Sequence, residues 1–563
     1  MKKEILKLLK KEGIKADETL IEVPPDPGMG DYAFPCFMLA KEMKKSPQKI
    51  AEELAKKIKP DNNISKTEAK GPYLNFFVNR SNIADDVLGK IRKEGYDYGS
   101  IKQKKPKKIM VEFPSPNTNK PLHLGHVRNM LIGESISRIS GFLGKKVIRA
   151  NLNNDRGIHI CKSMLAYQRW GNKKDPDTKT DHFVGKFYVL FNEKSKEKPH
   201  LELEAQEMLK KWEDGDKETI KLWKLMNAWA YGGFEETYEK LHINFDKYYY
   251  ESEFYGKAKK IVDEGLKKKI FYRDEEGAAA VDLGKELGKK VLLRADGTSI
   301  YITQDLYLAK LKFEEYRLDE SIYVVGNEQN YHFKVLFRLL EMLGYEWSKR
   351  CHHLSYGMVY LPSGKMKSRE GTVVDADEII DNMKDLAAVE VRKRYPDLND
   401  DETKKRAEII GLGALKFFML KNDPYKDMFF NPAESISFEG ETGPYVQYAH
   451  ARICSILHKL QDKKNKNMKA DYSLLIDRHE VELVKMLQNF PAVLADAEKN
   501  LKPSEIAHYL TALSQKFNEF YHNCPVISAK DELKAARIAL CGAVKTILGQ
   551  GLFLLGIQAP EEM

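Results

Sequence analysis

Two histidines on either side of a glycine are the residues with the clearest chemical potential in this sequence. His123, Gly125 and His126 end the segment PNTNKPLHLGH, residues 116–126, which follows a short apolar run at residues 109–113. Apolar residues then recur at helical spacing, so the pattern predicts a strand, a turn and a helix. Such a turn lies at the carboxyl edge of a parallel sheet, beside a helix N-terminus with about half a positive charge and free N–H groups. Imidazoles at that position suit a polyphosphate whose negative charge grows during a reaction.

The histidine motif by itself leaves two interpretations open. Gly125 has no side chain, so a flat or bulky group can lie against the backbone there. Histidines also flank a glycine by chance, however, and a helix can begin with a histidine for no chemical reason. The choice between these interpretations depends on the rest of the chain.

A second cluster of charge lies about 240 residues further on, in SYGMVYLPSGKMKSREG. Lys365, Lys367 and Arg369 fall between two glycines, Gly364 and Gly371. A glycine-bounded loop of cations can close on phosphates and open again. The alternative is a basic turn that is simply solvated.

Polar residues near the ends of other predicted elements extend the candidate site. Residues 153–155, Asn-Asn-Asp, follow the strand pattern KKVIRAN, and strand ends collect ligand groups in α/β proteins. Tyr301 and Asp305 are four apart, so they share a face if a helix begins there. Gln329 follows a β-rich run. Glu251 lies among aromatic residues in FDKYYYESEFY, where an ordinary surface glutamate is the default interpretation.

An aromatic strand near the N-terminus could contact RNA. Tyr73 and Asn75 alternate onto one face of the predicted strand GPYLNFFVN. An unpaired base needs a ring to stack on and an amide to read its edge. The alternative is that these residues belong to the core of a small α/β unit.

Composition and length exclude several classes of protein. The chain has 563 residues, of which 42% are hydrophobic and 31% charged, as in globular proteins, and its length suggests three or four domains. Its net charge of +10 permits a polyanionic partner. The six cysteines are scattered without a CxxC pair, which argues against a disulfide frame and structural zinc. Because we find neither a signal-peptide pattern nor an apolar run of roughly 20 residues, we expect a cytoplasmic protein.

The order of the patterns predicts an α/β protein with a Rossmann-type parallel-sheet catalytic core and two flanking domains. A small α/β domain is expected first, and an all-α helical bundle last. The expected divisions are an N-terminal domain at 1–80, a linker at 81–107, a catalytic domain at 108–385 with a helical insertion at about 165–245, a helical stem at 386–442 and the bundle at 443–563.

HLGH after a strand, followed by KMKSR, resembles the paired signature of class I aminoacyl-tRNA synthetases. More specifically, SPNTNKPLHLGHVRN, VEFPSPN, ESEFY, YITQD, GNEQNYH and TGPYVQYAHAR resemble the arginyl-tRNA synthetase family. The N-terminal GDYAF and GPYLNFF and the final LGIQAPEEM are also similar to that family. The resemblance covers essentially the whole chain.

This resemblance implies a two-step reaction on L-arginine, ATP and tRNA(Arg). The arginine carboxylate attacks the α-phosphate of ATP, pyrophosphate leaves, and a terminal ribose hydroxyl of tRNA then attacks the arginyl-adenylate. Neither step needs a protein nucleophile, so catalysis consists of positioning and charge stabilisation. Mg²⁺ is expected with ATP and held by phosphates, with no dedicated protein metal site. The family also implies a monomer that binds neither membrane nor DNA, and a need for tRNA even in the first step.

The resemblance also assigns residues. The implied catalytic residues are Lys120, His123, His126, Lys365 and Lys367. The implied ATP-binding residues are Pro116, Asn117, Thr118, Asn119, Pro121, Leu122, Leu124, Gly125, Met366, Ser368 and Arg369. The implied arginine-binding residues are Glu112, Asn117 and His123 at the α-groups and Glu251, Tyr301, Asp305 and Gln329 around the side chain. The implied tRNA contacts are Tyr73 and Asn75, in a domain that grips the tRNA elbow, and the C-terminal bundle would bind the anticodon.

One position departs from the class signature KMSKS. Ser368 occupies the place of the second lysine. Lys120, Lys367 or Arg369 would then supply the missing charge.

Three alternatives remain for comparison. Other nucleotidyltransferases with HxGH at a helix start are much shorter and lack a long helical C-terminal domain. A cysteinyl-type synthetase would need zinc-binding cysteines, whose pattern this sequence lacks. A non-catalytic tRNA-binding relative would be expected to lose HLGH or the lysine loop, and the sequence has both.

Overall fold

Five parallel strands form the sheet on which the candidate site is built. Their order is β11-β10-β4-β5-β6, so β4, the first of these strands in the sequence, lies in the middle. The next two strands, β5 and β6, are added on one side of β4, and the last two, β10 and β11, on the other. A sheet of this kind has its crevice at the carboxyl ends of the strands beside the point of reversal. The strands are β4 (Lys108–Glu112), β5 (Lys146–Asn153), β6 (Lys247–Tyr250), β10 (Glu320–Gly326) and β11 (Cys351–Tyr356).

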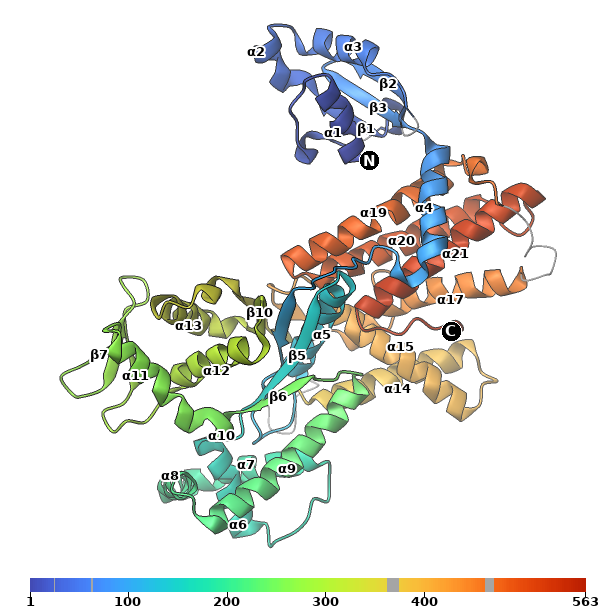
Figure 1. Ribbon diagram of the computed structural model, residues 1–563. Coiled ribbons are helices and arrows are strands. Elements are labelled where there is room, and N and C mark those ends of the chain that lie inside the picture. Colours follow the sequence, from blue (N-terminus) through green and yellow to red (C-terminus); the bar gives the residue numbers. More distant parts are fainter. Residues whose placement is uncertain (25, 62–63, 362–373, 461–469) are drawn as a thin grey trace. The chain divides into compact units, whose positions relative to one another are not determined.

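The computed structural model describes residues 1–24, 26–61, 64–361, 374–460 and 470–563 (Figure 1). Its residues fall into two compact units. The sheet belongs to the larger unit, which consists of Gly99–Ala451, Pro491–Ala512 and Leu548–Met563. The smaller unit consists of Met1–Tyr98, Arg452–Phe490 and Leu513–Ile547.

Helices cover both faces of the sheet. Helix α5 (Leu124–Phe142) packs against β4, β5 and β10, while α12 (Tyr301–Tyr316) and α13 (Asn330–Met342) share a core with Met110 and Ile148. Because β4 is covered on both sides, its middle residues form a continuous apolar run, which is typical of buried parallel strands. The strand, turn and helix predicted around the histidine motif are thereby confirmed.

Four helices are inserted between β5 and β6. They have a core of their own, in which Tyr167, Phe183 and Trp229 make edge-to-face contacts. The helices are α6 (Ile158–Trp170), α7 (Thr180–Glu197), α8 (His200–Glu213) and α9 (Lys217–Lys240).

A second insertion, between β6 and α12, was not predicted from the sequence. It begins with α10 (Glu251–Phe254) and α11 (Lys259–Lys267), and it ends in a three-stranded antiparallel sheet. The strands are β7 (Tyr272–Arg273), β8 (Ala279–Asp282) and β9 (Lys289–Leu293). The strands are short, so their alternation spans too few residues to stand out in the sequence.

After β11 the larger unit is mainly helical. A short parallel pair joins β12 (Val359–Tyr360) to β13 (Met428–Phe429). The helices are α14 (Ala376–Arg394), α15 (Asp400–Lys421) and α16 (Pro432–Ser435).

The N-terminal residues form a three-stranded antiparallel sheet in the smaller unit, in the order β1-β3-β2. Ser46 caps α3 by accepting a hydrogen bond from the Lys49 N–H, and Pro47 is the first helical residue, as predicted. The elements are α1 (Lys2–Lys11), β1 (Tyr32–Pro35), α2 (Ala40–Met43), α3 (Pro47–Lys57), β2 (Ile64–Lys70), β3 (Tyr73–Val78) and α4 (Arg80–Glu94).

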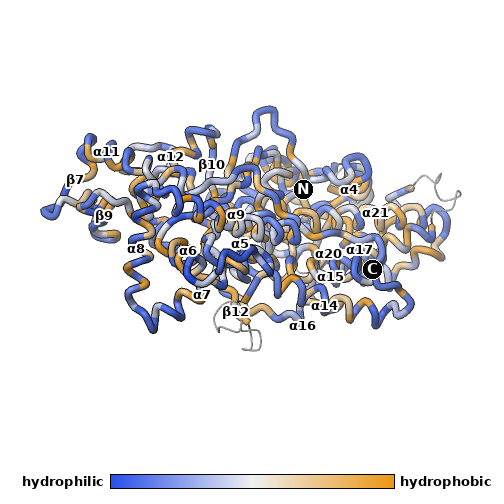
Figure 2. The backbone as a smooth tube through the Cα atoms, turned by 90° about the horizontal axis from the view of Figure 1, so that it is seen from below, coloured by the Kyte–Doolittle hydropathy of each residue, from blue (hydrophilic) through white to orange (hydrophobic). Residues whose placement is uncertain are grey.

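Long amphipathic helices complete the chain, and Figure 2 shows hydrophobic and hydrophilic residues alternating along them. They are α17 (Gly443–Lys459), α19 (Arg478–Asn500), α20 (Pro503–Asn523) and α21 (Asp531–Leu554). Among the described residues, α21 alone is long and apolar enough for a membrane span, which the sequence analysis did not anticipate. Its apolar window is 67% buried against the rest of the protein, as in a core helix.

Candidate active site

A cavity of about 610 Å³ opens at the carboxyl edge of the sheet. It is lined from the end of β4, the turn that follows it, the end of β5, α10, α12 and the start of α13. Ten of the predicted site residues line this one cavity, although they come from segments far apart in the sequence. They are Glu112, Asn117, Asn119, Lys120, His123, His126, Glu251, Tyr301, Asp305 and Gln329.

The two histidines cap helix α5 with one ring nitrogen each. The Nδ1 atom of His123 accepts a hydrogen bond from the Gly125 N–H at 3.1 Å, and the Nδ1 atom of His126 accepts one from the His123 N–H at 3.1 Å. The ring centroids are 3.8 Å apart. A neutral imidazole whose Nδ1 accepts must carry its proton on Nε2. Both rings therefore have an Nε2–H donor available to the cavity.

Burial keeps these two rings neutral. It lowers the pKa of His123 to about 4, helped by the neighbouring ammonium of Lys120 and opposed by Asp375. It also lowers the pKa of His126 well below its usual value, and His123 and Lys120 add to that effect. Burial lowers the pKa of Lys120 as well. The motif thus provides hydrogen-bond donors rather than two additional charges.

Gly125 fits this arrangement because a side chain there would press on the imidazole of His123. A Cβ atom at this position would lie 3.0 Å from Cε1 and 3.1 Å from Nδ1 of His123. The space over Gly125 is therefore adjacent to the capping ring.

The turn before the histidines is held to the end of β5. The Pro116 carbonyl accepts a hydrogen bond from the Asn154 N–H at 2.9 Å, and the Thr118 N–H donates to the Asn154 carbonyl at 3.2 Å. Pro121 packs against helix α7, where a Cβ at Gly185 would lie 2.7 Å from it. Thr118, Leu122 and Leu124 are buried, and their side chains do not line the cavity.

The segment that follows the lysine loop in sequence pairs with the histidine turn. The Leu124 N–H donates to the Val374 carbonyl at 2.9 Å, and the Ala376 N–H donates to the Leu122 carbonyl at 3.0 Å. Residues 374–376 therefore lie beside residues 122–124. The five predicted residues of the loop itself fall outside the described part of the chain: Lys365, Met366, Lys367, Ser368 and Arg369.

Carboxylates from other elements line the same cavity; we call the part lined by Glu251 and Asp305 the carboxylate end and the part at the histidine turn the histidine end. Glu251 is the first residue of α10 and is buried, and Asp305 lies on α12, one turn after Tyr301 at the helix start. Burial raises the pKa of Glu251 to about 7; Arg156 lowers it, while Asp155 and Asp305 raise it further. A buried carboxyl with a raised pKa lacks sufficient positive charge nearby. Tyr301 is exposed at the rim of the cavity and is the first residue of α12, so the condition under which it shares a helix face with Asp305 is met.

His332 is a site residue that the sequence analysis missed. Its Nε2 lies 2.6 Å from the Asp305 carboxylate, and the hydrogen bond raises the pKa of the imidazole although burial opposes it. His332 follows Gln329 by three residues, at the start of α13, so the two share a helix face. That spacing was the available signal.

Lys312 was missed as well. Its ammonium is fully buried and forms an ion pair with Glu112 at the end of β4. It lies seven residues after Asp305 on the same helix, so the two residues face the same way. One oxygen of Glu112 is thus already engaged by the protein itself.

The turn after β5 connects Glu251 to the helical insertion. The buried Asp155 accepts hydrogen bonds from the N–H of Ser252 at 2.9 Å and from its hydroxyl at 2.7 Å. The neighbouring Arg156 pairs with Glu213 at 2.6 Å and lies 4.0 Å from Glu251. The sequence analysis singled out residues 153–155, but it gave no role to Arg156.

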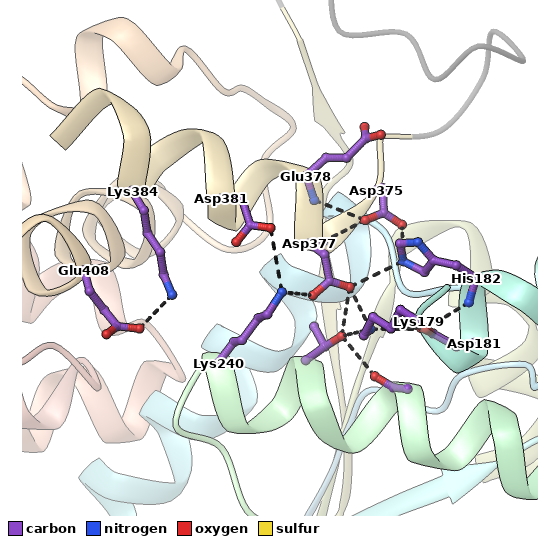
Figure 3. Close-up of polar contacts among 12 residues, drawn as sticks. Lys179, Asp181, His182, Lys240, Asp375, Asp377, Glu378, Asp381, Lys384 and Glu408 are labelled. Carbon is purple, nitrogen blue, oxygen red and sulfur yellow. Dashed lines mark hydrogen bonds and ion pairs between the residues drawn. The ribbon is translucent and has the colours of Figure 1, made fainter. Parts of the chain in front are cut away.

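An ionic cluster joins the start of α7, the end of α9 and the start of α14 (Figure 3). It lies beside the histidine turn, because Asp375 forms an isolated β-bridge with His123. The buried Asp377 accepts hydrogen bonds from Lys179 at 2.7 Å and Lys240 at 2.8 Å, and His182 lies 3.2 Å from Asp375 and 3.5 Å from Asp377. The neighbouring carboxylates of Asp375 and Asp377 raise the pKa of His182 to about 10. Asp181, His182 and Asp377 are close enough together to hold a metal ion, but two ammonium groups already balance Asp377. We call these five residues the Asp377 cluster: Lys179, His182, Lys240, Asp375 and Asp377.

The two residues proposed for RNA contact differ in exposure. Tyr73 is partly exposed at the start of β3 and makes an edge-to-face contact with Phe37, whose centroid is 5.7 Å away. Asn75 is 2% exposed, so its amide is largely covered by its own domain.

Comparison with known families covers almost the whole chain. A family model described as the catalytic domain of class I tRNA synthetases (R) matches residues 89–432. The arginyl tRNA synthetase N terminal domain matches residues 1–78, and the DALR anticodon binding domain matches residues 446–563.

Individual proteins agree with the family models. The chain is 48% identical to an arginine–tRNA ligase of Treponema denticola, over 98% of this chain and 96% of that one. It is 44% identical to an arginine–tRNA ligase of Parabacteroides distasonis, over 95% and 94%. Among solved structures, the arginyl-tRNA synthetase of Thermus thermophilus matches with a TM-score of 0.83 and 28% identity, over 100% of this chain and 99% of that one. The chain belongs to the arginyl-tRNA synthetase family.

Proposed function

We propose that the cavity at the carboxyl edge of the sheet is where this chain joins arginine to ATP before passing it to tRNA. The chain is an enzyme that charges tRNA with arginine, and its family uses ATP. The observation that carries the assignment to this cavity is the lining: neutral imidazole donors at one end and buried carboxylates at the other. A polyphosphate suits the first end, and a guanidinium suits the second.

The histidine end would bind the ATP phosphates. His123 and His126 would donate their Nε2–H groups, while Lys120 would balance the charge that develops as pyrophosphate leaves. Asn117 and Asn119 line the same end and would contribute amide donors. Pro116, Thr118, Pro121, Leu122, Leu124 and Gly125 would contribute through their backbone and the shape of the turn.

The lysine loop would add the remaining cations. Lys365 and Lys367 would stabilise the transition state, with Met366, Ser368 and Arg369 beside the nucleotide. The segment that follows the loop in sequence pairs with residues 122–124, which supports this assignment. With Ser368 in the place of a lysine, Lys120, Lys367 and Arg369 are the candidates for its charge.

The carboxylate end would recognise the arginine side chain. Guanidinium is a planar fork of donors, and Glu251 and Asp305 offer acceptors on two different elements for paired hydrogen bonds. Tyr301 and Gln329 would close around the side chain. Lysine has a point charge and would leave acceptors unpaired, and sites that hydrogen-bond their substrate can reject such analogues by about 10⁴-fold.

The α-groups of arginine would lie between the two ends, near Glu112, Asn117 and His123. Lys312 engages one oxygen of Glu112, which leaves the second oxygen for the α-ammonium. The carboxylate of arginine would then face the nucleotide, as its attack on the α-phosphate requires.

Mg²⁺ would enter with ATP. Glu251 and Asp305 would be taken up by the arginine side chain and Glu112 is already paired with Lys312, so the phosphates would supply the hard oxygen ligands near the histidines. Mg²⁺ would supply charge neutralisation there. We further propose that the enzyme works in the cytoplasm as a monomer, contacting neither membrane nor DNA.

The flanking domains would hold tRNA(Arg). The N-terminal domain would bind the tRNA elbow, with the Tyr73 ring as a stacking surface and Asn75 beside it. The C-terminal helices would bind the anticodon. We also propose the domain edges that the sequence predicts: 1–80, 81–107, 108–385 with the helical insertion at about 165–245, 386–442 and 443–563.

Arginine-dependent pyrophosphate exchange, measured with and without tRNA, tests this proposal. We expect exchange that depends on arginine and is stimulated by tRNA. We expect Asp305→Ala to raise the arginine KM by roughly 30-fold or more, while the ATP KM changes little, because the lost carboxylate faces only the amino acid. Equal effects on both KM values would contradict the assignment of the two ends.

A further inference from the structure

Arg156 is the first charged residue after the sequence Asn-Asn-Asp at the end of β5, and its side chain is buried between two insertions. Its guanidinium carbon lies 3.3 Å from the centroid of the Tyr255 ring. One of its nitrogens lies 2.6 Å from Glu213 at the end of α8, and another lies 4.0 Å from Glu251. The side chain is 7% exposed. Arg156 is therefore fixed by stacking and by an ion pair before any substrate arrives.

We propose that Arg156 is a specificity-determining residue, whose fixed guanidinium favours the charged form of the Glu251 carboxylate, the form that binds the guanidinium of arginine. This inference rests on the proposed role of Glu251 in binding the arginine side chain. Arg156 itself does not contact the substrate in this account. It acts through Glu251.

The surroundings of Glu251 explain why a resident cation is needed. Asp155 on the turn after β5 and Asp305 on α12 both oppose its charge, and burial does so more strongly than either. The guanidinium of Arg156 supplies the main opposing influence, because its positive charge lowers the pKa of Glu251. His332 pairs with Asp305 at 2.6 Å. Without Arg156, a proton would replace the missing cation on Glu251.

Arg156 does not compete with the substrate for Glu251, because its own hydrogen-bonding partner is elsewhere. The 2.6 Å contact to Glu213 is that of a direct charged hydrogen bond, whereas 4.0 Å to Glu251 is too long for one. Attraction between charges persists at the longer distance in a poorly hydrated site. The direct hydrogen bonds of Glu251 thus remain available to an incoming fork of donors.

The preceding residue has a complementary task. Asp155 binds the N–H and the hydroxyl of Ser252, which directly follows Glu251 on α10. Asp155 thus fixes where the Glu251 backbone lies, and Arg156 sets the charge of its side chain. Two adjacent residues of one turn act on one recognition residue.

The pH dependence of kcat/KM for arginine tests the proposal, since this profile reports groups that titrate in the free enzyme. The full-length enzyme would be assayed by pyrophosphate exchange with tRNA, as wild type, Arg156→Lys and Arg156→Gln. An opposite charge within about 4–6 Å lowers a carboxyl pKa by about 1–3. Arg156→Gln should therefore raise the acidic midpoint of the profile, the pH at which kcat/KM falls to half on the acidic side, by about one pH unit or more. The arginine KM should rise roughly tenfold near neutral pH, recover towards wild type at alkaline pH, and leave the ATP KM nearly unchanged.

Arg156→Lys should leave the acidic midpoint close to that of the wild type, because lysine retains the positive charge although it lacks the planar guanidinium. A loss of activity in Arg156→Gln that is equal at every pH would show a merely structural role. A lower arginine KM would show that Arg156 competes with the substrate. Either result would overturn the inference.

Glu213→Gln gives an independent test with the opposite sign, and it is useful if Arg156→Gln does not fold. Removing the partner of Arg156 leaves its charge less compensated, so the acidic midpoint should move down rather than up. An unchanged or raised midpoint would count against the inference. Glu251→Gln distinguishes a failure of the proposed function from a failure of this inference. If Glu251→Gln leaves the arginine KM unchanged, the proposed function of Glu251 fails. If it raises the KM but the acidic midpoint of the pH profile does not move in the Arg156 and Glu213 variants, only the role of Arg156 is refuted.

Discussion

Glu251 and Asp377 are equally hidden from solvent, yet burial has opposite outcomes at the two sites. Glu251 is 5% exposed and Asp377 is 6% exposed. The pKa of Glu251 is raised to about 7, mainly by burial. The pKa of Asp377 is lowered, although burial opposes it, because the charged ring of His182 lies 3.5 Å away and Lys179 and Lys240 donate hydrogen bonds to it. The difference lies in their partners and not in their depth.

The comparison separates a group that stabilises the fold from a group that awaits a ligand. Asp377 has its counter-charges inside the protein, so its ion pairs are part of the folded structure. Glu251 has a single cation at 4.0 Å and two carboxylates nearby, so its charge is incompletely balanced. A protein keeps such a group where a substrate completes the balance. We propose that in this enzyme the completing cation is the arginine side chain.

Disrupting the Asp377 cluster, whose charges are balanced within the protein, should produce the largest loss of stability. Asp377→Ala leaves Lys179, Lys240 and His182 without their shared acceptor, and removing one partner of a buried pair costs about 3–5 kcal/mol. Calorimetry should show a clearly lower Tm. Asp381→Ala is the matched control, because Asp381 is largely exposed and 3.8 Å from Lys240. Its effect should stay within about 0.5 kcal/mol. Similar Tm values for the two variants would remove the distinction between the sites.

Removing the charge of Glu251, which the protein balances only in part, should change arginine binding instead of stability. Glu251→Gln keeps the shape but removes the charge, so the arginine KM should rise roughly 100-fold while the Tm stays level or increases. A level or higher Tm is expected because a buried, poorly paired charge has been removed. Glu253→Gln, an exposed neighbour on the same short helix, should behave as wild type in both assays. A large drop in Tm for Glu251→Gln would mean that Glu251 is a structural group after all.

The stability of the Asp377 cluster should depend on pH in a defined direction. His182 has a raised folded pKa of about 10, so its contribution is complete below the unfolded value of 6.5 and is lost as pH rises towards 10. Asp377 has a lowered folded pKa, so its contribution is present above its unfolded value and is lost as pH falls through the acidic range. His182→Gln should therefore cost more stability near pH 6 than near pH 10, by about 1 kcal/mol after allowing for the partial exposure of the ring. An equal cost at both pH values would show that His182 is not charged in the folded protein.

The histidine end and much of the fold could be predicted from the sequence because their signals are local. A strand, a turn and a helix occupy consecutive residues, and Tyr301 and Asp305 share the face of a single helix that begins where expected. Ser46 and Pro47 likewise mark the start of α3 within a few residues. Adjacent residues carry such information directly.

The partners of the carboxylates could not be predicted in the same way. Arg156 lies 57 positions from Glu213 and 95 positions from Glu251, and Lys312 reaches Glu112 across 200 positions. No local pattern encodes which charges the fold brings together. The antiparallel sheet of β7, β8 and β9 was missed for a different reason, since its strands contain only two to five residues each.

Proton release on arginine binding tests the central claim most directly. Isothermal titration calorimetry at about pH 6, in two buffers that differ in ionisation enthalpy, counts the protons exchanged per arginine bound. With a pKa of about 7, Glu251 is mostly protonated at that pH, so the incoming guanidinium should expel close to one proton; at about pH 8.5 it should expel almost none. Glu251→Gln should abolish the release. Arginine binding at pH 6 without proton release, or an undiminished release in Glu251→Gln, would contradict the account.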